Sequence, residues 1–228
     1  MPQKRGGPAR RRNTRVHRAP NQRMNTAVSH TGPVPDRFIT SLNYSELHAM
    51  TTAGVGVPVQ QLYRANSLFD PNLTGIGHQP LGHDELATLY TKYTITGISY
   101  RVTFTNQSTT DYAEVAVVVR PNNVAYTLMD TVFEAPYVQR GVVGPETGAQ
   151  NIKAFSGTMS IAKIRGVPER KVLDESDYSA LFGANPWVTP TLQLYAENQN
   201  TLAAITVNAR VEIKYHTQIF DRKVLIQS

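Results

Sequence analysis

The sequence predicts an all-β protein: a single eight-stranded jelly-roll sandwich that carries a disordered basic arm at its N-terminus and one or two short helices in its loops. Three observations support this class. Seven or eight segments have strand patterns, no segment has the periodicity of a long amphipathic helix, and several connections between strands are long. Long loops favour a jelly roll over an immunoglobulin-like sandwich, which has shorter turns and fewer residues.

The first segment, residues 1–35, is the predicted arm and linker, and residues 36–228 form the predicted β domain. Residues 1–23 contain eight cationic side chains, no Asp or Glu, three prolines and two glycines. The cationic side chains are Lys4, Arg5, Arg10, Arg11, Arg12, Arg15, Arg18 and Arg23. Because this segment has almost no apolar surface to bury, it cannot offset the entropy lost on ordering. We therefore expect it to be disordered when unbound.

The basic character of the chain lies in this arm. The chain has 23 Lys and Arg against 17 Asp and Glu, so removing the eight cations of the arm leaves residues 24–228 with a net charge of −2. Such an asymmetry indicates a polyanionic partner, either nucleic acid or an acidic membrane surface. Since the body is nearly neutral, the arm alone is predicted to make the contact.

The first half of the body is predicted to hold two strands and a short helix. The strands lie at residues 37–52 and 59–68, and the turn-rich residues 69–83 follow them. Candidate inward-facing side chains of the first strand are Phe38, Leu42, Tyr44 and Leu47. Asp84 is the predicted N-cap of a helix over residues 84–90, whose apolar side chains share one face.

The clearest strand covers residues 98–105, where apolar and polar side chains alternate with period two. Residues 115–119 are continuously apolar and β-branched, which predicts a strand buried on both faces. A short helical turn is predicted at residues 126–134, inside a long connection.

The second half adds three strands. Residues 152–164 are the better of one or two strands after residue 136, and residues 187–197 form the next. Residues 206–219 form an unusually long strand in which alternate side chains are apolar. Between them, residues 166–186 are polar and irregular.

Composition excludes several classes of protein. The chain has no cysteine, so disulfides and thiolate metal sites are absent. No apolar run reaches the roughly 18 residues of a membrane span, and the N-terminus lacks the apolar segment of a signal peptide. Motifs of serine hydrolases, phosphate-binding loops and zinc proteases are also missing. We therefore predict no catalytic residue, no cofactor and no membrane partner.

Two clusters could bind a metal ion, but each has a simpler structural explanation. His78, His83 and Asp84 lie in a Gly/Pro-rich loop, where histidines commonly satisfy backbone groups, so we predict no metal there. Asp174, Glu175 and Asp177 could hold calcium, although their spacing lacks the full ligand set of a known loop, and an ordinary solvated acidic loop is favoured.

Residues 64–84 resemble a segment of the capsid proteins of small circular single-stranded DNA viruses, the circovirus-like or CRESS-DNA viruses. The shared pattern is Asn-Ser at 66–67, an aromatic residue, Asp-Pro at 70–71, glycine, Gly-His-Gln-Pro at 77–80 and a further glycine. A short helix, a Tyr-x-x-Tyr at 90–93 and an amphipathic strand follow, so the resemblance covers about forty residues. The order of a basic arm, a β body and a long final strand is also similar, so the resemblance extends over the whole chain.

The resemblance implies a capsid subunit with a single jelly-roll shell domain. Copies would assemble into a small icosahedral T=1 shell, roughly sixty subunits at the least, around circular single-stranded DNA, with the arm inside. It further implies residence in the virion and, during assembly, in the host nucleus. Residues 9–12, Ala-Arg-Arg-Arg, would suit a host nuclear import receptor.

The chemistry of the arm agrees with packaging. Arginines bind phosphate bidentately and stay charged. The arm has no aromatic side chains on which bases could stack, so its binding should be independent of base sequence and strongly dependent on salt. On physical grounds alone, DNA and RNA are equally suitable.

The residues are also compatible with two other functions. One is a non-viral β domain that binds nucleic acid through a basic tail, in the manner of a chromatin or ribonucleoprotein component. The other is a cupin-like metal enzyme that uses His78 and His83 with further ligands such as His48 or His216. Particle formation by the expressed chain would distinguish the capsid from both.

Overall fold

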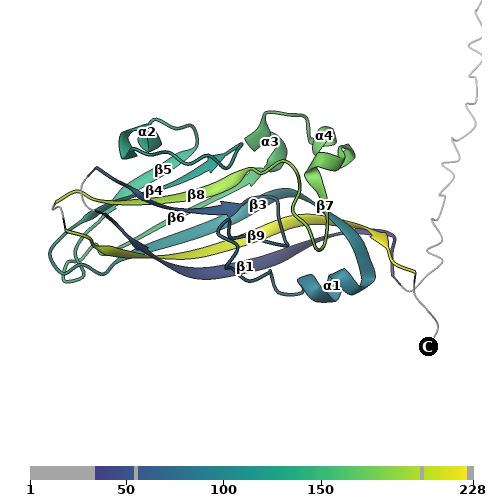
Figure 1. The fold of residues 1–228 in the computed structure, drawn as a ribbon, viewed down its shortest axis with the longest axis horizontal. Coiled ribbons are helices and arrows are strands. Elements are labelled where there is room, and N and C mark those ends of the chain that lie inside the picture. Colours follow the sequence, from purple (N-terminus) through teal and green to yellow (C-terminus); the bar gives the residue numbers. More distant parts are fainter. Residues whose placement is uncertain (1–33, 54–55, 201–202, 225–228) are drawn as a thin grey trace, which may run out of the picture. The chain divides into compact units, whose positions relative to one another are not determined.

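The structure, a computed structural model, describes residues 34–53, 56–200 and 203–224. In these residues nine strands form two antiparallel sheets, and short helices lie in the connections (Figure 1). The strands are β1 (Arg37–Thr51), β2 (Val59–Arg64), β3 (Tyr90–Asn106), β4 (Ala113–Arg120), β5 (Val138–Val143), β6 (Ile152–Ser160), β7 (Ser179–Leu181), β8 (Thr191–Asn198) and β9 (Thr206–Arg222). The helices are α1 (His83–Leu89), α2 (Met129–Phe133), α3 (Ile161–Arg165), α4 (Glu169–Asp174) and the 3-10 helix η1 (Ser176–Tyr178).

The order of the strands is that of a jelly roll. Sheet A has the order β1-β9-β3-β6, and sheet B has the order β2-β8-β4-β5. Apart from the β4–β5 hairpin in sheet B and the short β7 that follows β6 in sheet A, consecutive strands lie in different sheets, as in the double Greek key of an eight-stranded jelly roll. The predicted fold class is therefore confirmed, and β7 adds a short ninth strand that pairs with the beginning of β3.

The core lies between the inner faces of the two sheets. Tyr44, Phe104 and Tyr215 from sheet A and Val117 and Leu194 from sheet B belong to one buried apolar cluster. In β1 and β9, buried and exposed positions alternate along most of the strand, as expected for a sheet with one solvated face. Leu47, predicted to face inward, is 55% exposed, because it lies on the odd-numbered, outward positions of β1.

A second, smaller apolar cluster covers the outer face of sheet B. The connection between β4 and β5 folds over that face and places Met129 and Val132 of α2 against Ala116, Val118 and Tyr195. This is why β4 is buried on both faces, as its sequence predicts.

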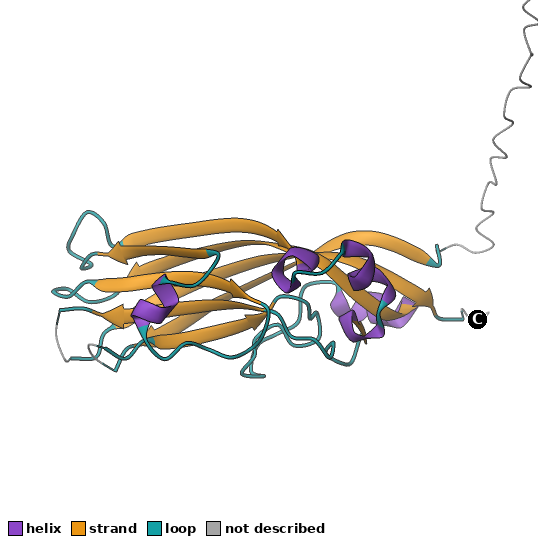
Figure 2. Ribbon diagram, turned by 90° about the horizontal axis from the view of Figure 1, so that it is seen from above, coloured by secondary structure: helices purple, strands orange, loops and turns teal. Residues whose placement is uncertain are grey.

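The helices differ from the prediction in number and detail. Four α-helices are present in the described residues instead of one or two, because α3 and α4 lie in stretches assigned to a strand and to an irregular loop. Ser160 is the N-cap of α3, and its side chain accepts a hydrogen bond from the Lys163 amide; left-handed Gly166 is the C-cap. Figures 1 and 2 show α1, α3 and α4 gathered at one end of the sandwich and α2 nearer the other.

Several predicted boundaries were wrong: β3 begins at residue 90 instead of 98, β2 ends at residue 64 instead of 68, and β6 ends at residue 160 instead of 164. The N-cap of α1 is Gly82, in the left-handed conformation with φ 87°, and Asp84 lies inside the first turn. The strand predicted from Trp187 begins only at Thr191, since Pro186 and Pro190 confine the intervening residues to a loop. In this part of the molecule, proline and glycine determine the boundaries more strongly than apolar content does.

Candidate functional site

The eight predicted nucleic-acid-binding side chains, from Lys4 to Arg23, lie outside the described residues. The described chain begins at Val34, where it is fixed to the body. The Arg222 guanidinium donates to the Val34 carbonyl oxygen at 2.8 Å, and the Tyr90 hydroxyl donates to the Pro35 carbonyl oxygen at 2.7 Å. Arg222 also pairs with Asp36 at 3.2 Å. The body therefore starts beside the end of β9.

The charges of the body are unevenly distributed over its surface. On the outward side of sheet A, Arg210, Glu212 and Lys214 occupy successive exposed positions of β9, and Arg101 of β3 lies directly opposite Glu212. Three cations and one carboxylate thus meet at the centre of this face, among serine, threonine and asparagine side chains. The net charge of −2 for the body does not show that cations gather on this face.

The segment that carries the resemblance is tied to the body by partly buried hydrogen bonds. The Asn66 amide donates to the Val188 carbonyl oxygen at 2.7 Å, and the Ser67 hydroxyl donates to Asn185 at 2.6 Å. Arg64 binds the Asp70 carboxylate at 2.5 Å and the Asp70 carbonyl oxygen at 2.8 Å. These contacts give the Asn-Ser and Asp-Pro elements of the pattern a structural role, because they fix two long loops to each other.

Asn72 is the centre of the same segment and is fully buried. Its side-chain oxygen accepts from Gln61 at 2.7 Å and from the Thr74 amide at 3.0 Å, and its nitrogen donates to Glu46. The Tyr44 hydroxyl donates to the same carboxylate at 2.6 Å. Burial, and then the hydrogen bond to Glu46, raises the pKa of Tyr44 far above its usual value, so the phenol remains a donor.

The histidines of this segment have structural contacts. His83 is buried; its Nε2 donates to the Phe182 carbonyl oxygen at 2.9 Å, and its Nδ1 lies 2.9 Å from the Asp84 carboxylate. The His78 ring contacts Tyr44 edge-on, with 4.7 Å between ring centroids. Neither His48 nor His216 joins them: both lie on strands of sheet A, and the described residues contain no cluster of three metal-ligating side chains.

The acidic cluster is paired with neighbouring cations. Asp174 accepts from Arg170 at 2.9 Å, and Glu175 lies 3.4 Å from Lys171, each one helical turn away along α4. The Asp177 carbonyl oxygen accepts from the Val188 amide. The first two carboxylates therefore balance charges on their own helix.

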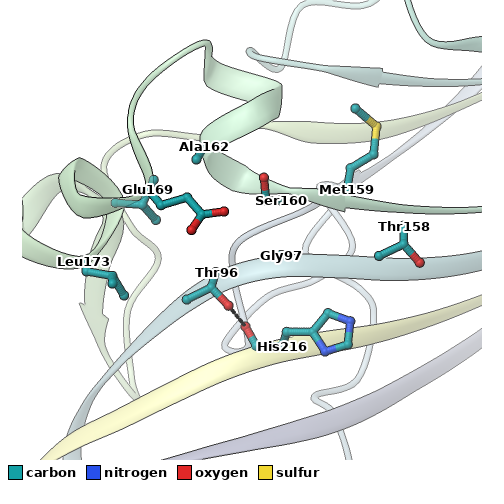
Figure 3. Close-up of a pocket in the computed structure, with 10 residues that line it drawn as sticks. Thr96, Gly97, Thr158, Met159, Ser160, Ala162, Glu169, Leu173 and His216 are labelled. Atoms are coloured by element: carbon teal, nitrogen blue, oxygen red, sulfur yellow. Dashed lines mark hydrogen bonds between the residues drawn. The ribbon is translucent and has the colours of Figure 1, made fainter.

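A pocket lies between helices α3 and α4 and the outward face of β3, and we call it the α3–α4 pocket (Figure 3). Its volume is about 370 Å³, and its walls are largely apolar. The lining residues are Thr96, Gly97, Thr158, Met159, Ser160, Ala162, Glu169, Val172, Leu173 and His216. The exposed Glu169 side chain extends from α4 toward β3.

A β-bulge forms the floor of this pocket. The register between β3 and β9 shifts between Ile95 and Gly97, which leaves Thr96 as an extra residue whose hydroxyl donates to the His216 carbonyl oxygen at 3.1 Å. A Cβ on Gly97 would lie 2.9 Å from the Met159 carbonyl oxygen, so only glycine allows β6 to approach there. Beyond this point β6 leaves the sheet as α3, and β7 takes the place beside β3.

Sequence reasoning missed two surface features. The pocket arises from a bulge and a chain reversal, for which only the Thr-Gly pair at 96–97 in a strand gives a local signal. The other feature is Trp187, the only tryptophan of the chain, whose side chain is 87% exposed. The Pro-Trp-Val-Thr-Pro stretch could have indicated a projecting loop.

No protein-family model and no curated protein matches the sequence. The chain is similar to a solved structure of Desmodium yellow mottle tymovirus, at 13% identity and a TM-score of 0.40, covering 90% of this chain and 100% of that one. It is also similar to the decameric BFDV capsid protein, at 10% identity, 80% and 98% coverage and a TM-score of 0.43.

A third similar structure is the semi-empty VLP of a nodavirus of the giant freshwater prawn Macrobrachium rosenbergii, at 10% identity, 92% and 94% coverage and a TM-score of 0.45. At these identities and TM-scores the likeness is loose. The assignment of the jelly roll rests on the strand pairings described above. No helix in the described ranges is long and apolar enough to cross a membrane.

Proposed function

We propose that the protein is a viral capsid subunit whose jelly-roll domain forms a closed shell and whose N-terminal arm binds the packaged genome. The observation that carries the proposal is the division of charge. Eight cations and no carboxylate lie in residues 1–23, whereas the β body has a net charge of −2. The resemblance of residues 64–84 to capsid proteins of circular single-stranded DNA viruses supports the same function and favours single-stranded DNA as the cargo.

The charge of the arm is of the right size for packaging. A T=1 shell of about sixty subunits would bring roughly 480 arm cations to a genome of a couple of thousand phosphates. Arginine contacts to phosphate carry no sequence information, so binding would be general for single strands. The same Arg-rich stretch would serve as a nuclear import signal before assembly, and the assembled protein would reside in the virion.

The outward face of sheet A is the side of the body that suits a polyanion. Arg101, Arg210 and Lys214 outnumber Glu212 there, and hydroxyl and amide side chains lie among them, although the exposed Leu47 lies opposite Arg210. Side chains of these types make most contacts to phosphate in protein–nucleic acid complexes. We therefore propose that sheet A faces the genome.

One experiment tests the function directly. The full chain is expressed, purified and analysed by size exclusion and negative-stain microscopy at physiological salt. Uniform small shells that absorb at 260 nm and release nuclease-sensitive material are expected. A stable monomer at micromolar concentration under these conditions would refute the capsid function.

A further inference from the structure

We propose that Trp187 of one copy inserts into the α3–α4 pocket of a second copy and so forms a head-to-tail contact between subunits. The proposal deepens the proposed function and rests on it, since it identifies one contact by which copies of the chain would join. The two partners are different surfaces of the same chain. Contacts of this kind close into rings when the rotation between neighbours permits.

Trp187 projects from a loop that is held in place on several sides. In that loop, Val188 accepts from Asn66 at 2.7 Å and donates to the Asp177 carbonyl oxygen at 3.2 Å. Pro190 accepts from the Ala65 amide at 2.8 Å, and Asn185 accepts from the Ser67 hydroxyl at 2.6 Å. Because the frame is fixed, docking the indole would cost little further loop entropy.

The exposure of this side chain is costly in an isolated subunit. Tryptophan has a large apolar surface and is usually mostly buried, yet Trp187 is 87% exposed. Rigidly presented tryptophans are among the commonest anchors of protein interfaces. The loop residues 182–190 contain no charged side chain, which favours a protein partner over the phosphates of a nucleic acid.

The α3–α4 pocket has the chemistry that an indole requires. Ala162 and Val172 contribute to its apolar wall, and the Leu173 side chain, 46% exposed, offers an accessible apolar contact to an indole. The Glu169 carboxylate, which extends over the pocket in Figure 3, can accept a hydrogen bond from the indole nitrogen. Within the described ranges no hydrogen bond or ion pair occupies this carboxylate. The volume of about 370 Å³ lies within the usual range of binding pockets.

The single tryptophan allows the contact to be read by fluorescence. Leu173→Asp keeps Trp187 but places a charge on the pocket wall, and Trp187→Ala keeps the pocket but emits no tryptophan signal. Both positions are at least 46% exposed, so both variants should fold. When the Trp187→Ala chain is added to the Leu173→Asp chain, we expect the emission maximum to move to shorter wavelength and acrylamide quenching to fall several-fold.

The matched control is the double variant Trp187→Ala/Leu173→Asp, which lacks both partners and should leave the emission unchanged. An equal shift with the double variant would overturn the proposal. Particles of the unmodified chain whose tryptophan stays fully quenchable would also overturn it, while leaving the capsid function intact. If the unmodified chain forms no particles at all, both proposals fail.

Discussion

Glu114 and Glu197 face each other across β4 and β8, at the edge of the small cluster under α2. Glu197 is buried and accepts from the Gly56 amide, whereas Glu114 is partly exposed. Burial raises the pKa of Glu114, and the carboxylates of Glu197 and Asp130 raise it further, against the opposing effect of Arg140. Like charges placed directly opposite in a sheet are destabilising.

We therefore predict that Glu114→Gln stabilises the body at neutral pH. Because the folded-state pKa of Glu114 is raised, the contribution of this residue to the free energy of unfolding falls as pH rises from 4.5 through the folded value. The variant should gain about 0.5 kcal/mol at pH 8, a small value because solvent screens the pair, and less at pH 4. Urea unfolding at both pH values measures the difference. Glu146→Gln, at an exposed site, is the control, and an equal gain at both pH values would contradict the explanation.

A second residue-scale prediction concerns Gly77. A Cβ there would lie 2.7 Å from the Asn72 Cβ and 2.8 Å from the Tyr44 hydroxyl, so Gly77→Ala must displace the buried network around Asn72. We expect a loss of about 1–3 kcal/mol in the free energy of unfolding, measured by urea titration. Gly183→Ala meets nothing within 4 Å and should change stability little. Equal effects of the two substitutions would show that the close approach is unimportant.

At the scale of elements, the start of helix α1 depends on a glycine at its N-cap. Gly82 holds a left-handed conformation at the N-cap, with φ 87°, and Asp84 makes no capping hydrogen bond. Gly82→Ala should cost about 1 kcal/mol because an L side chain is strained there. Asp84→Ala should cost less, since it loses a favourable charge near the helix start and its contact with His83. Thermal unfolding measures the loss of stability in each variant. A larger loss for Asp84→Ala than for Gly82→Ala would show that Asp84 caps the helix.

The elements that the sequence predicts well are those with a long, regular alternation. The outward and inward faces of β9 follow directly from period two, and the continuous apolar run at 115–119 correctly indicates burial on both faces. Short elements depend on tertiary contacts instead. α3 has only five residues, and its position follows from the departure of β6 from sheet A at Gly97. The apolar residues near Trp187 favour a strand, but Pro186 and Pro190 keep this stretch in a loop.

At the scale of the whole molecule, the proposed function assigns separate roles to the arm and the body. We predict that deletion of residues 1–23 removes nucleic acid from the purified protein and leaves the β fold unchanged, since the body begins with its own anchor at Val34. The ratio of absorbance at 260 and 280 nm and circular dichroism measure the two effects. Loss of the β spectrum in the truncated chain would refute the separation of the two parts.

The pairing of β1 with β9 also sets the timing of folding. Arg37 lies opposite Phe220 and Thr51 opposite Thr206, so the first strand of the body is completed by the last. Contacts between such distant segments form slowly, because a long loop must close before they stabilise anything. Sheet A cannot be completed until the ribosome has synthesised β9, about 170 residues after β1 begins. Products of translation that stop before β9 therefore lack the central strand between β1 and β3, and under the proposed function they could not enter a growing particle as finished subunits.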